Sequence, residues 1–103
     1  MATIELSRAG EIALARAVET VIVTKAAPAP EDWKRTFAAL PPADRVALLG
    51  ASPRDALVTA LKCWRQAAKT AGDKWRRTLT VAAVVPTAAR LYPAIRAAQE
   101  ALQ

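Results

Sequence analysis

Alanine makes up about a quarter of this 103-residue sequence, whereas glycine occurs only three times. Alanine has the highest intrinsic helix propensity, and the residues interspersed with it, mainly Leu, Arg, Lys and Glu, also favour helices. Large apolar residues recur at spacings of three and four, which is the period of one helix face. The sequence therefore predicts an all-α fold, a compact bundle of five to six short helices.

We predict a single helical domain over residues 1–103. Residues 1–25 contain the first helix, residues 26–30 (Ala-Ala-Pro-Ala-Pro) form a stiff linker, and residues 31–103 form a basic helical region. A chain of this length buries only ~60–65% of the surface that it exposes when unfolded, so we expect marginal stability. A homo-oligomer or a larger complex would add stability by mass action.

Serine and proline mark where the predicted helices begin. Ser7 is expected to cap the first helix, and Pro30 suits the first position of the second. Ser52, with Asp55 three residues later, approximates a capping box. The first helix is predicted to end at Lys25 and the second before Pro41, and the third to begin at Asp44 with Gly50 as its C-cap. The fourth is predicted to end near Ala71 with Gly72 closing it, and Asp73 to cap the fifth. Pro86 is expected to end or kink the fifth helix, and Pro93 to split the last one. Short strands at residues 21–24 and 79–85 are the alternatives, because β-branched residues gather there.

The predicted core consists of apolar residues on one face of each helix. They are Leu14, Val18, Val21, Ile22, Trp33, Phe37, Leu40, Leu57, Leu61, Trp64, Ala68, Ala71, Trp75, Leu79, Ala82, Leu91, Ile95, Ala98 and Leu102. Cys63 is expected to be a half-buried small apolar residue, with a thiol activated by neighbouring cations as the alternative. A single cysteine cannot form a disulfide framework, which fits a reducing, cytoplasmic compartment.

Most residue patterns that support catalysis are missing. The sequence contains no His, one Cys and only isolated glycines, so it has no Ser-His or Cys-His pair, no thiolate zinc site and no phosphate-binding loop. Five carboxylates lie in the first turns of predicted helices, where capping and the helix dipole explain them: Glu31, Asp32, Asp44, Asp55 and Asp73. We therefore predict no enzyme activity, no metal and no cofactor. No apolar stretch approaches the ~20 residues that cross a bilayer, so no membrane partner is expected.

Positive charge is concentrated in the second part of the chain. Residues 1–32 carry three basic and five acidic groups, whereas residues 33–103 carry twelve basic and four acidic groups, which together give the net charge of +6. Cations recur along one stripe of the fourth predicted helix and again at the start of the fifth, after a tight turn. The candidate binding residues are Arg54, Lys62, Arg65, Lys69, Lys74, Arg76 and Arg77, with Lys34, Arg35 and Thr59 as weaker candidates.

A cluster of this kind is typical of a surface that neutralises phosphates. The sequence thus predicts a non-enzymatic helical module that binds the nucleic-acid backbone, DNA or RNA, as a subunit of a nucleoprotein complex. The same cations would also serve an acidic protein partner. A small helical adaptor or inhibitor of the phage or mobile-element type, suggested by analogy alone, is therefore an alternative.

The stretch from Asp44 to about Lys62 is similar to the turn of helix-turn-helix DNA-binding motifs. The resemblance implies that Gly50 is the turn glycine and that Ser52-Pro53 begins a recognition helix. The residues that it would turn toward the DNA groove are Arg54, Asp55, Thr59 and Lys62. The sequence departs from the motif at Val46, where Ala is usual, and at Ala56, which is small. A DNA reader is therefore a further alternative.

Overall fold

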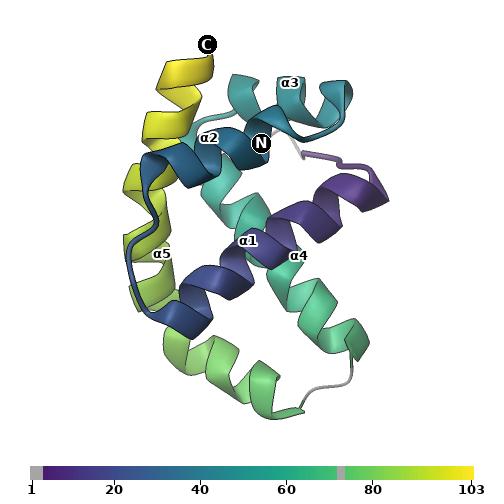
Figure 1. The fold of residues 1–103 in the computed structure, drawn as a ribbon. Helices are drawn as coiled ribbons and strands as arrows, with labels where there is room; N and C mark the ends of the chain where they lie inside the picture. The colour runs from purple at the N-terminus through teal and green to yellow at the C-terminus, as the bar shows by residue number, and fades with distance from the viewer. Residues whose placement is uncertain (1–3, 72–73) are drawn as a thin grey trace.

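The computed structural model describes the backbone of residues 4–71 and 74–103 and the side chains of residues 4–70 and 84–103. Within these residues the chain forms five helices and no strand (Figure 1). They are α1 (Arg8–Thr24), α2 (Pro30–Ala38), α3 (Pro42–Gly50), α4 (Pro53–Ala71) and α5 (Lys74–Leu102). The predicted all-α fold is confirmed, and residues 21–24 and 79–85 are helical rather than extended.

The helices pack around α5, which contacts each of the other four. α1 crosses α4, and α2 packs on α5 (Figure 1). α3 lies at one end of the molecule against α2 and α5. The Pro/Ala linker between α1 and α2 runs alongside α5, so this extended segment forms part of the molecular surface (Figure 1).

One apolar cluster takes residues from all five helices. Its largest members include Trp33 and Phe37, whose rings meet edge to face with centroids 5.7 Å apart. The predicted core residues that are buried are Leu14, Val18, Val21, Trp33, Phe37, Leu40, Leu57, Trp64, Ala68, Leu91, Ile95 and Ala98. Ile22, Leu61 and Leu102 are partly buried against this cluster, and the side chain of Ala71 lies outside the described residues. Helical periodicity therefore identified buried residues on α1, α2, α4 and the C-terminal part of α5, whereas the side chains of Trp75, Leu79 and Ala82 lie outside the described residues.

Asp44 closes the N-terminus of α1 rather than that of its own helix. Ser7 is the N-cap of α1 as predicted, and its hydroxyl accepts a hydrogen bond from the Gly10 amide (3.2 Å). The backbone N–H of Ser7 donates to Asp44 Oδ1 (3.0 Å), and its hydroxyl donates to Oδ2 (2.5 Å). The sequence placed Asp44 in the first turn of α3 correctly, but its carboxylate is buried and joins two helices.

Gln99 of α5 and Gln103, the residue that follows the end of α5, satisfy C-terminal carbonyls of α3, which have no partners within their own helix. The buried Gln99 donates from Nε2 to the carbonyls of Leu48 (2.8 Å) and Ala51 (3.1 Å). Gln103 donates from Nε2 to the carbonyl of Leu49 (2.6 Å). These bonds extend to Ala51, the C-cap of α3, so the prediction that Gly50 would be the cap is wrong by one residue.

Three other predicted boundaries differ from the structure. α3 begins at Pro42, two residues before the predicted start at Asp44. α2 ends at Ala38, before Pro41 is reached. α5 continues through Pro86 and Pro93, so the predicted break at Pro93 is wrong. The two prolines are exposed and seven residues apart, so they lie on the same outward face of α5. A proline has no N–H, so one carbonyl in the preceding turn lacks its helix donor. On this face water can hydrogen-bond to that carbonyl instead. α5 bends in its N-terminal half (Figure 1), as prolines inside helices commonly cause. The predicted cap residues Gly72 and Asp73 lie outside the described residues.

Candidate nucleic-acid interface

Four of the predicted binding residues lie along one helix, α4. The helix begins at Pro53 because the Ser52 hydroxyl accepts a hydrogen bond from the Asp55 amide (3.1 Å), as the sequence predicted. Its buried side, which includes Leu57 and Trp64, fixes how the helix is turned relative to α1 and α5. The exposed cations are Arg54, Lys62, Arg65 and Lys69. We call these four residues the basic face.

No side chain of the basic face makes an ion pair or a hydrogen bond with another described residue. α4 carries one carboxylate, Asp55, which lies in the first helical turn, where it favours the positive end of the helix dipole. Between residues 56 and 71 the helix has three cations and no acidic residue. The C-terminal two thirds of α4 therefore expose three cations that no described carboxylate pairs with directly.

The weaker candidates do not join the basic face. Lys34 and Arg35 lie on α2, where they pair with carboxylates of the same helix: Lys34 Nζ lies 3.7 Å from Glu31 and the Arg35 guanidinium 2.5 Å from Asp32. Thr59 is half-buried, and its hydroxyl donates to the carbonyl of Asp55 (2.8 Å). The side chains of Lys74, Arg76 and Arg77 lie outside the described residues. Whether they extend the basic face therefore stays a prediction.

Of the four residues that the helix-turn-helix resemblance would turn toward DNA, Arg54 and Lys62 are exposed, whereas Asp55 and Thr59 are half-buried. Val46, the departure from the motif in α3, is 71% exposed. α3 itself packs against α2 and α5. This arrangement supplies only part of the surface that a recognition helix needs to enter the major groove.

Cys63 lies on the buried side of α4, as predicted for a small apolar residue. Burial, reinforced by the negative charge of Glu11, raises the pKa of the thiol from 9.0 to about 11. The alternative of a thiol activated by neighbouring cations is therefore wrong. The next residue, Trp64, is also buried, and its indole N–H donates to Glu19 of α1. These contacts bind α4 to α1 and leave the basic face as the side of α4 available to a partner.

We expect the Cys63 thiol to resist labelling in the folded protein. At about pH 8 its thiolate fraction should be roughly 100-fold lower than in the unfolded chain, because the thiolate is the reactive form and each pKa unit is a factor of ten. The folded pKa lies above the unfolded one, so the stability that the thiol contributes is complete below pH 9.0 and is lost as the pH rises toward about 11.

The measurements are the rate of reaction with an aromatic disulfide reagent and urea unfolding across this alkaline range. Cys63→Ala is the control, and its stability should fall less steeply with pH than that of the parent protein. Fast, stoichiometric labelling of the native protein would contradict the assignment.

Among the described residues, no group of three or more His, Cys, Asp or Glu side chains is placed to hold a metal ion. In the same part of the chain, no helix combines the length and hydropathy that crossing a bilayer requires. Comparison of the sequence and fold with protein-family models, curated proteins and solved structures found no match.

Proposed function

We propose that this protein is a non-enzymatic helical module that binds the phosphate backbone of nucleic acid through the basic face of α4, as a subunit of a nucleoprotein complex. One observation carries the proposal: four cations on a single helix are exposed, and none is paired with another described residue. Free cations of this kind release the counterions condensed on nucleic acid when they approach phosphates, and this release drives binding.

The contrast with the cations of α2 and the C-terminal part of α5 supports the proposal. Lys34, Arg35 and Arg96 are each matched by a carboxylate one helical turn away on the same helix. Such exposed pairs add little stability, but they reduce the net field that a polyanion would meet. Among the described residues, the cations of α4 form no such pairs, so their charge remains available to an external anion.

The spacing on α4 suits backbone contact. Lys62 and Lys69, with Arg65 between them, lie seven positions apart, or about 10 Å along the helix axis at 1.5 Å per residue. Phosphates of one strand of duplex DNA recur about every 3.4 Å along the axis, so three flexible side chains on this length have several phosphates within reach. Contacts of this type position a protein without reading sequence. We therefore propose binding to DNA or RNA without strong sequence preference and without a metal or cofactor. The lone, buried Cys63 is the reason for proposing a cytoplasmic location.

The salt dependence of binding tests this proposal. Fluorescence anisotropy should give a slope of log K against log salt concentration of about −4 to −6 with labelled duplex DNA, and of about −3 to −5 with single-stranded RNA, if four to seven phosphates are neutralised. Absence of binding at low salt, or a slope near zero, would overturn the proposal. It would favour the alternative of an acidic protein partner, for which the same cations would serve.

A further inference from the structure

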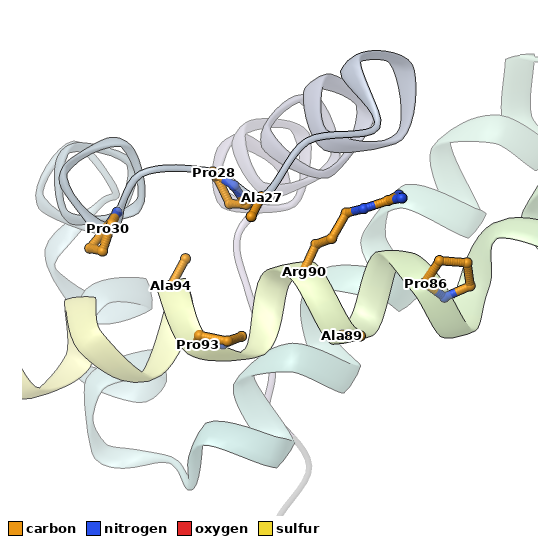
Figure 2. Close-up of a pocket in the computed structure, with 8 residues that line it drawn as sticks. All are labelled: Ala27, Pro28, Pro30, Pro86, Ala89, Arg90, Pro93 and Ala94. Carbon is orange, nitrogen blue, oxygen red and sulfur yellow. The ribbon is translucent and has the colours of Figure 1, made fainter.

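A groove with a volume of about 510 Å³ lies between the α1–α2 linker and α5. Figure 2 shows that the residues lining it come from these two segments, which face one another along the groove. Four of them are prolines, Pro28 and Pro30 on the linker side and Pro86 and Pro93 on α5, and Ala89 and Arg90 lie between the last two. The groove shares no residue with the basic face.

The wall formed by α5 is apolar and exposed. Val85, Ala89 and Pro93 follow one another at four-residue spacing, so they share one face of the helix, and all three are exposed. Val85, at 74%, is the most exposed of the large apolar side chains described. An outward helix face usually carries polar residues, so this stripe is unusual for a surface in contact only with water. Of these three residues, Ala89 and Pro93 line the groove, and Val85 lies one helical turn beyond Ala89.

The opposite wall offers backbone groups without partners. Within the described residues, the backbone of residues 26–28 makes no hydrogen bond. Ala29 has extended dihedral angles (φ −68°, ψ 141°), and Pro28 and Pro30, the first residue of α2, have no N–H to donate. The N–H of Ala27 and the carbonyls of Ala27 and Pro28 are therefore free to pair with a second extended chain. Such pairing is a recurrent mode of peptide recognition.

Arg90 is the charged residue of the groove. Its side chain is half-buried and extends from α5 on the side of the linker (Figure 2). It makes no ion pair or hydrogen bond with another described residue. The acidic residues of α2, Glu31 and Asp32, are paired with Lys34 and Arg35 instead. A partly desolvated guanidinium without a carboxylate favours an external anion, and its planar fork matches a carboxylate in particular.

We propose that this groove binds an extended acidic segment of a partner protein. Apolar side chains of the segment pack on the prolines and on Ala89, its main chain bonds to linker residues 26–28, and one of its carboxylates pairs with Arg90. A nucleic acid does not suit this groove, because its walls are apolar and it has a single cation. The proposal is therefore independent of the function proposed for the basic face.

The probes are short capped peptides that contain one Glu and one Leu at varied spacing. Each has a matched peptide in which Gln replaces Glu. Fluorescence anisotropy should reveal peptides that bind better than their Gln counterparts. The Arg90→Gln variant should weaken binding of those peptides about 10- to 100-fold, the range expected for a charge-assisted bond, and should leave the Gln peptides unaffected. Ala89→Trp, at an exposed position, should obstruct the groove and weaken both.

Two controls separate this proposal from general attraction to a basic protein. Arg96→Gln, which removes an arginine of the same helix that is already paired with Glu100, should leave peptide binding unchanged. A variant with the basic face reversed should keep its affinity for the peptides, and Arg90→Gln should keep its affinity for nucleic acid. If no peptide binds better than its Gln counterpart, or if binding follows the basic face rather than Arg90, the proposal is wrong.

Discussion

Replacing Lys62, Arg65 and Lys69 together by glutamate is expected to weaken binding to nucleic acid by at least about 100-fold at low salt. The three side chains are exposed and unpaired with other described residues, so their reversal removes phosphate contacts and adds repulsion without opening the core. The slope of log K against log salt should become shallower by about three, roughly one for each lost contact.

A second triple variant controls for net charge. This variant combines Arg8→Glu, Arg16→Glu and Lys25→Glu. It changes the net charge of the protein by the same amount, but its substitutions lie on or next to α1. If the basic face is the binding surface, this control should lose much less affinity than the α4 variant. Circular dichroism should show the same helix content in both. Equal losses in the two variants would mean that overall charge, rather than the α4 surface, determines binding.

The second large effect is expected at Gly10, where alanine should destabilise the protein by about 2–3 kcal/mol. A Cβ at this position would lie 2.2 Å from Asp44 Oδ2 and 3.0 Å from its Cγ. The carboxylate is buried and holds the N-cap residue Ser7 through two hydrogen bonds, so moving it away breaks the cap. This cost exceeds the gain of up to about 1 kcal/mol that alanine normally brings inside a helix. Thermal unfolding should show a midpoint lowered by about 10 °C or more.

Gly50→Ala is the matched substitution with the opposite expected sign. Gly50 is the last residue of α3, and a Cβ there meets nothing within 4 Å. The substitution should be neutral or stabilising by up to about 1 kcal/mol, because alanine restricts the unfolded chain more than glycine does. Equal stability of the two variants would show that the contact between Gly10 and Asp44 does not constrain the fold.

The features that the sequence predicted well depend on nearby residues. Ser7 and Ser52 cap helices through hydrogen bonds to amides three residues away, and this interaction has a local sequence pattern. The core faces follow from helical spacing, which places Trp64 inside and Lys62 outside on the same helix. The exposure of the basic face could therefore be predicted before any tertiary structure was known.

Contacts between distant residues could not be predicted in this way. Asp44 bonds to Ser7 across 37 positions, and Gln99 bonds to the carbonyl of Leu48 across 51. From the local sequence, Asp44 reads as an acid in a first helical turn and Gln99 as an amide on a helix surface. Only the packing of the helices buries both residues and gives them distant partners. The role of Arg90, which pairs with no other described residue, also escaped prediction, because its groove exists only where the linker runs beside α5. Pro93 was misread because its effect on α5 depends on which face it occupies.

The central place of α5 has a consequence for the rate of folding. α1, α2, α3 and α4 all pack on the helix that comes last in the sequence, and the pairs α1–α5 and α2–α5 join segments separated by most of the chain. Small helical proteins usually fold fast because their contacts are local. Here the chain must close long loops before much of its apolar surface is covered, so its relative contact order is raised and its folding is slowed compared with a bundle of sequential hairpins.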